Sequence, residues 1–97
     1  MAWTFESVLV EWRGPAPYVF APLPRDLTDD VKDAARGLAY WGQIPVTATI
    51  GETRFDTAMW PKDGRFLLPV KAAVQRAERI DVGDPVTVAV RLPGEIG

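Results

Sequence analysis

The chain has 97 residues, 47% hydrophobic and 25% charged, with 11 basic and 13 acidic side chains and neither cysteine nor histidine. This length and composition predict one soluble globular domain over residues 1–97. Without cysteine there can be no disulfide, thiol nucleophile or thiolate metal site. Without histidine the commonest metal ligand and the usual general base at neutral pH are also missing. We therefore expect no metal site and no cofactor.

The net charge of −2 provides no general attraction to phosphate, so nucleic acid is the partner least expected. Residues 51–80 do hold more basic than acidic side chains, six against four. Such an excess is typical of a solvated face, with a binding patch as the alternative. The first ten residues lack the pattern of a signal peptide, and no apolar run is long enough to span a bilayer. We expect a cytoplasmic protein with no membrane partner.

The first half of the chain predicts two extended segments followed by a helix. Residues 4–12 are rich in β-formers and predict a strand. Residues 18–23 predict a second one, short or at a sheet edge, because Pro22 cannot donate to a ladder. Apolar residues at positions 27, 31, 34, 35 and 38 form one stripe and predict a helix over 25–36.

Residues 44–60 predict a β-hairpin around the two-residue turn Gly51-Glu52. Hydrophobic and polar residues alternate before this turn, as they do in a strand with one buried face. Counting back across the turn gives the core-facing pairs Ala48–Phe55, Val46–Thr57 and Ile44–Met59. On the opposite face, Thr49 pairs with Arg54, Thr47 with Asp56 and Gln43 with Trp60.

The remaining elements follow closely along the chain. Residues 61–64 predict a turn, and 65–69 a strand that places Leu67 on the face of Trp60. Residues 70–79 predict a short helix with Val70, Val74 and Ala77 inward and Lys71, Gln75 and Glu78 outward. Alternating valines predict a last strand over 86–92, and residues 93–97 are expected to form a frayed tail.

An internal repeat organises these elements. The segment 45–50, Pro-Val-Thr-Ala-Thr-Ile, matches the segment 85–90, Pro-Val-Thr-Val-Ala-Val, forty positions later. A strand ending in proline, a helix and a polar turn precede both segments. The chain therefore reads as two β-β-α-β halves, about 1–50 and 51–92. Each half is too small to bury a core alone, so we expect them to intertwine in a pseudo-twofold barrel of about six strands.

Several motifs in this order resemble the bacterial domain-of-unknown-function family nineteen-oh-five. They are Leu23-Pro24, Trp41-Gly42 before Ile44-Pro45-Val46, Ile50-Gly51 before Phe55, Pro61-Lys62-Asp63-Gly64, Leu67-Leu68-Pro69-Val70-Lys71 and Val82-Gly83-Asp84-Pro85. The resemblance covers about residues 4–92 and implies a double-split β-barrel like that of AbrB-type regulators and MazE-type antitoxins. The barrel there forms from two chains, whereas the repeat predicts both halves in this one chain. The resemblance implies a fold and no assigned activity.

The candidate ligand-binding residues are Tyr18, Trp41, Arg54, Trp60, Leu67 and Lys71. Trp60 either lines a groove on the face opposite Phe55 and Met59 or is covered by another element. Arg54 and Lys71 could meet an anionic ligand there, and an ion pair of Arg54 with Asp56 or Glu52 is the alternative. Tyr18 is a candidate hydroxyl donor at the barrel mouth or a buried tyrosine.

Three classes of function remain open, with no catalytic residue assigned. The first, which we favour, is a non-enzymatic module that binds a small ligand or a protein partner, as a monomer or homodimer. The second is a small barrel enzyme of the isomerase, dehydratase or cyclase type, which needs a closed, partly apolar cavity. The third is a nucleic-acid-binding regulator, which needs the basic residues of the second half on one face: Arg54, Lys62, Arg65, Lys71, Arg76 and Arg79.

Overall fold

The computed structural model describes residues 2–12, 18–36 and 43–93. These ranges hold seven strands and two short helices. In chain order they are β1 (Ala2–Val8), β2 (Val10–Trp12), β3 (Tyr18–Pro22), α1 (Arg25–Ala34), β4 (Ile44–Ile50), β5 (Thr53–Lys62), β6 (Arg65–Pro69), α2 (Ala72–Glu78) and β7 (Pro85–Arg91). The mainly β architecture with two helices is confirmed. Trp41, Gly42 and all but the first residue of the expected tail lie outside the described residues.

Seven strands are present where about six were expected because Leu9 divides the first one into β1 and β2. The Leu9 N–H donates to the Asp84 carbonyl at 3.0 Å, and its own carbonyl accepts from the Gly83 N–H at 2.8 Å. Its side chain is buried in the core at 1% exposure. The backbone of Leu9 is therefore bonded to the loop before β7 rather than to a neighbouring strand, and the chain bends at this point.

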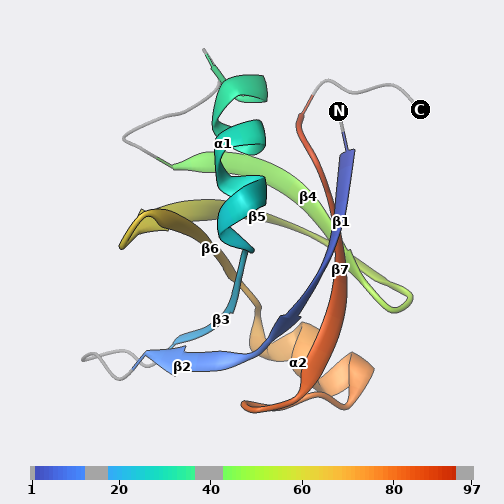
Figure 1. The fold of residues 1–97 in the computed structure, drawn as a ribbon. Helices are drawn as coiled ribbons and strands as arrows, with labels where there is room; N and C mark the ends of the chain where they lie inside the picture. The colour runs from blue at the N-terminus through green and yellow to red at the C-terminus, as the bar shows by residue number, and fades with distance from the viewer. Residues whose placement is uncertain (1, 13–17, 37–42, 94–97) are drawn as a thin grey trace.

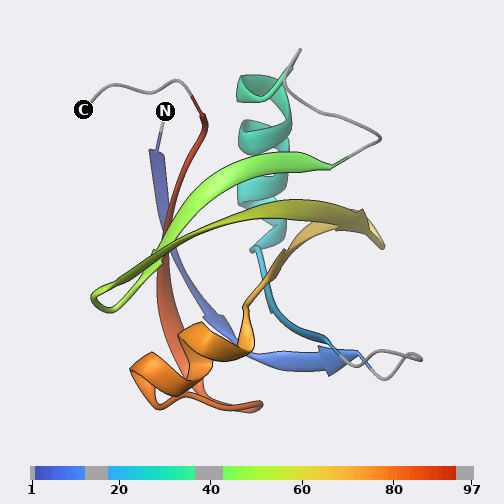
Figure 2. The same cartoon turned by 180° about the vertical axis from the view of Figure 1, so that it is seen from behind.

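The strands form one antiparallel sheet in the order β1-β7-β4-β5-β6-β3-β2. Its two edge strands, β1 and β2, follow one another in the chain with only Leu9 between them. The sheet must therefore roll up, and the Ser7 hydroxyl donates to the Pro22 carbonyl at 2.7 Å between β1 and β3. The two helices lie at opposite ends of the rolled sheet in both views (Figure 1, Figure 2). Neither described helix has the length and apolar character that a bilayer-crossing segment needs.

The pairing of the strands confirms the pseudo-twofold repeat. β4 and β7 are the last strands of the two halves, and they pair with Thr49 opposite Ala89, equivalent positions forty residues apart. The flanking pairs Ala48–Val90 and Ile50–Val88 lie symmetrically about this centre. β1 pairs with β7 as the first part of β5 pairs with β4, which makes Phe5 equivalent to Phe55, fifty positions later. Each half thus completes the sheet of the other.

The hairpin register is confirmed: Ala48 lies opposite Phe55, Val46 opposite Thr57 and Ile44 opposite Met59. The following turn is tighter than expected, because β5 continues to Lys62 and only Asp63 and Gly64 connect it to β6. Both turn residues have positive φ, 52° and 80°. Positive φ at both central positions defines a type I′ turn, whose twist matches that of the flanking strands.

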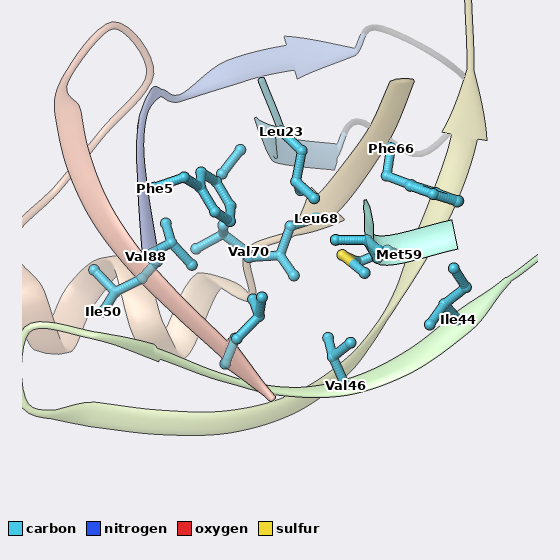
Figure 3. Close-up of a cluster of buried hydrophobic side chains, with 14 of the residues drawn as sticks. Phe5, Leu23, Ile44, Val46, Ile50, Met59, Phe66, Leu68, Val70 and Val88 are labelled. Carbon is cyan, nitrogen blue, oxygen red and sulfur yellow. The ribbon is translucent and has the colours of Figure 1, made fainter. Parts of the chain in front are cut away.

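The core fills the inside of the rolled sheet with apolar side chains from both halves (Figure 3). The strand residues alternate, so that Ala21, Met59, Phe66 and Leu68 point inward. Val31 from α1 and Val74 from α2 join this cluster. In the described ranges no polar or charged residue is buried. The inside of the barrel is therefore packed with apolar groups that offer no acid or base.

Helix α2 is rotated from the expected orientation. Val74 is buried as expected, but Ala77 is exposed, so its expected inward position is wrong. Glu78, expected to point outward, is half-buried and accepts a hydrogen bond of 2.6 Å from the Thr53 hydroxyl. The reason is that α2 packs against β5, which turns the end of the helix toward the first residues of that strand.

The Thr53–Glu78 hydrogen bond fastens α2 to β5, and its removal can be measured. We expect Thr53→Val to lower the free energy of unfolding by about 1 kcal/mol, because the two side chains have similar volumes and only the hydrogen bond is lost. Urea unfolding followed by circular dichroism provides the measurement. Thr87→Val, at an exposed position of β7, is the matched control. Equal losses in both variants would show that the hydrogen bond does not stabilise the fold.

Candidate functional site

The outer surface of strands β5, β6, β3 and β2 carries an unusual set of side chains. Strand alternation directs them away from the core, because their neighbours Ala21, Met59 and Leu68 point inward. We call this surface the aromatic face. Its members are Val10, Trp12, Tyr18, Phe20, Pro22, Trp60, Lys62, Arg65 and Leu67.

Phe20 is the centre of the aromatic face. Its exposure is only 1%, yet it does not belong to the core cluster inside the barrel. The centroid of its ring lies 5.9 Å from that of Tyr18, 6.1 Å from that of Trp60 and 6.4 Å from that of Trp12. Tilted rings at these distances attract one another beyond the burial of their area. Phe20 is therefore the centre of a second, smaller apolar cluster on the outside of the sheet.

The three rings around Phe20 remain open to solvent. Trp12 is 46% exposed, Tyr18 51% and Trp60 38%. Single exposed apolar side chains are common on protein surfaces, but grouped aromatic rings are typical of binding sites. The expected alternative of a buried Tyr18 is wrong, and Trp60 is not covered by another element.

A groove of about 420 Å³ covers part of the aromatic face, and Tyr18 and Trp60 do not line it. Phe20, Pro22 and Leu67 line it from the two inner strands, β3 and β6, while Trp12 and Lys62 line it from the outer strands, β2 and β5. The Lys62 ammonium lies 4.0 Å from the centroid of the Trp12 ring. Because three strand spacings of about 4.8 Å separate β2 from β5, these two side chains reach toward each other above the inner strands.

The charge at the groove is mixed, with an excess of one positive charge. Arg25, Lys62 and Arg65 supply three cations, and Glu11 and Asp63 supply two carboxylates. The Arg25 guanidinium donates to the backbone carbonyl of Asp63 at 3.2 Å, which holds it under the β5–β6 turn. The groove thus combines an apolar floor with Lys62, Arg65 and the Asp63 carboxylate at the β5–β6 turn.

The structure brings together three of the six candidate binding residues. Tyr18, Trp60 and Leu67 share the aromatic face, where Trp60 and Leu67 are directly opposite on β5 and β6. Lys71 is exposed at the N-cap of α2, next to Val70, whose N–H donates to the Val19 carbonyl. It therefore lies at the Tyr18 end of β3. Trp41 lies outside the described residues.

Arg54 does not belong to this site. It lies six residues before Trp60 on β5, about 20 Å away at the rise of a strand. Its expected partner Asp56 accepts a hydrogen bond of 3.0 Å from the Thr47 hydroxyl. Lys62 and Arg65 are at the other end of β5, and Arg76 and Arg79 are on or next to α2. The basic residues of the second half therefore do not converge on one surface.

Sequence reasoning missed Trp12, Phe20, Lys62 and Arg25 as members of the site. Alternation could have placed Tyr18 and Phe20 on one face of the strand, because they are two positions apart. Ala21, the next residue, then lies on the opposite face. No local pattern could have placed Trp12 beside Lys62, which is fifty residues distant. That contact depends on the closure of the barrel.

Among the described residues, no group of three or more acidic, histidine or cysteine side chains is placed to hold a metal ion. No match to the chain was found among curated proteins. Residues 5–90, most of its length, match the family model described as "Domain of unknown function (DUF1905)". The chain belongs to this family.

Proposed function

We propose that this protein is a non-enzymatic module that binds a small ligand in the groove of the aromatic face. The observation that carries the proposal is the cluster around Phe20, in which Trp12, Tyr18 and Trp60 stay between 38% and 51% exposed. The volume of the groove, about 420 Å³, is within the range of small-molecule sites, about 300–1,000 Å³. Rings already packed against one another present an apolar surface at little further entropic cost.

The other two classes of function have less support. An enzyme of the shaped-pocket type requires polar groups inside a closed cavity, and the described core holds only apolar residues. A nucleic-acid regulator requires a continuous basic surface, and Arg54 and Lys62 are at opposite ends of β5. A protein partner on the aromatic face is the remaining alternative, and it would use the same rings.

The proposal is tested with the neutral dye N-phenyl-1-naphthylamine, whose fluorescence rises in apolar sites. We expect saturable binding by the wild type and a dissociation constant about tenfold higher for Trp12→Leu. Trp12 lines the groove, and an aromatic side chain in a binding site often supplies about 1–2 kcal/mol of binding free energy. Fluorescence titration provides the measurement.

Val82→Ala is the matched control, since Val82 is 44% exposed but lies in the loop before β7. Its affinity should equal that of the wild type. No saturable binding, or equal weakening in both variants, would contradict a small-ligand site on the aromatic face.

A further inference from the structure

We infer that the ligand of the aromatic face is a planar ring compound with an anionic group, and that Lys62 and Arg65 bind this group. The inference rests on the proposed function and specifies the chemical class of its ligand. The anionic group can be a carboxylate, a sulfonate or a phosphate, because each is a compact negative charge that lysine and arginine side chains bind.

The position of Lys62 is the first support. A lysine side chain on a surface turn normally samples many rotamers, and restricting it costs entropy. Here its ammonium is held 4.0 Å from the Trp12 ring centroid, at the rim of the groove. A cation over an aromatic ring is attracted by the ring's negative face. Trp12 therefore positions the Lys62 charge next to the apolar floor before any ligand arrives.

The second support is the register between Lys62 and Arg65. The two residues are directly opposite on β5 and β6, adjacent to the two-residue turn. Side chains at such a pair leave the same face of the sheet about 5 Å apart. Both side chains also line the groove, so an anion bound at this end would be attracted by two cations. The ring of the same ligand would then lie over Leu67 and Pro22, which are the next pair along the face.

The third support comes from a comparison of the two halves of the barrel. Equivalent positions fifty residues apart agree inside the core, where Phe5 corresponds to Phe55. On the aromatic face they differ: Trp12 corresponds to Lys62, so one half supplies a ring where the other supplies a cation. These two side chains are in contact with each other. The difference between the halves creates a surface with an aromatic side and a cationic side.

The test compares two dyes with the same ring system. 8-Anilinonaphthalene-1-sulfonate carries a sulfonate, and N-phenyl-1-naphthylamine is its neutral counterpart. We expect the affinity of the sulfonate dye to be at least about fivefold higher than that of the neutral dye, because it makes two partly exposed charge contacts. This affinity should fall as sodium chloride is raised from about 20 to about 300 mM, because salt screens exposed charges. The affinity of the neutral dye should stay constant over this range.

Variants locate the anion site. Lys62→Met keeps a long apolar side chain against Trp12, and combined with Arg65→Gln it should remove the preference for the sulfonate dye while leaving the neutral dye bound. Arg76→Gln, an exposed cation on α2, is the matched control and should retain the preference. Displacement of the sulfonate dye by 1-naphthyl phosphate or by 1-naphthoate then shows which anion the site prefers.

The results of these titrations distinguish the anionic ligand from the small-ligand site itself. Equal affinity for both dyes, or a sulfonate preference that survives in the Lys62→Met/Arg65→Gln variant, would overturn the anionic ligand and leave the small-ligand site standing. Failure of both dyes to bind would overturn the proposed function itself. A preference that salt and the double variant both remove supports the inference.

Discussion

Replacing Phe5 or Phe55 with alanine is expected to lower the free energy of unfolding by about 3–5 kcal/mol, and by similar amounts for the two positions. The two rings are buried, with exposures of 5% and 8%, and both belong to the core cluster. Phe5 lies opposite Val88, and Phe55 lies opposite Ala48, the equivalent residue of the other half. Because the halves exchange strands, neither half can lose its phenylalanine without weakening the other.

Urea unfolding of the wild type and the variants measures this effect. A loss of 3–5 kcal/mol is a large part of the stability of a domain this size, so Phe5→Leu and Phe55→Leu are measured in parallel to keep the proteins folded. Val82→Ala, at an exposed position, should change stability by less than about 0.5 kcal/mol. A cost at one phenylalanine less than half that at the other would contradict equivalent packing of the halves.

The parts of the fold that local patterns determine were predictable. The hairpin of β4 and β5 has strict alternation on one side and a two-residue turn, and these two features fix its register without reference to the rest of the chain. The repeat around Pro45 and Pro85 likewise predicted that the two halves intertwine, because one half is too small to bury a core alone, and the pairing of β4 with β7 joins them.

The parts that depend on distant residues were not predictable. The bend at Leu9 arises because its backbone forms hydrogen bonds with residues 83 and 84, in the loop before β7. No pattern within the segment 4–12 predicts a contact with that loop. The orientation of Glu78 depends on Thr53, which comes from another element. At the site, Trp60 and Leu67 could be placed on one face from the turn between them. Phe20 and Trp12 join them only when the barrel closes and brings β3 next to β6.

Phe20→Ala is expected to lower the free energy of unfolding by about 3 kcal/mol, although Phe20 lies outside the barrel core. Phe20 is only 1% exposed, within the range of the core residues, and its ring contacts the rings of Tyr18, Trp12 and Trp60. Removal of the central ring leaves a cavity that three half-exposed rings can only partly fill. The same change should abolish saturable binding of N-phenyl-1-naphthylamine, because the floor of the groove is lost.

Two further variants distinguish structure from function at this position. Tyr18→Ala removes a ring that is 51% exposed and should cost less than about 1 kcal/mol. Phe20→Leu keeps most of the buried volume, so its free energy of unfolding should be within about 1.5 kcal/mol of that of the wild type. Its affinity for the dye should still be lower, because leucine cannot hold Trp12 and Trp60 at ring-contact distances. If Phe20→Ala costs no more than Tyr18→Ala, the outer cluster does not contribute to folding. If Phe20→Ala is less stable but binds the dye as tightly as the wild type does, the dye occupies another surface. The rings around Phe20 would then contribute to stability and not to binding.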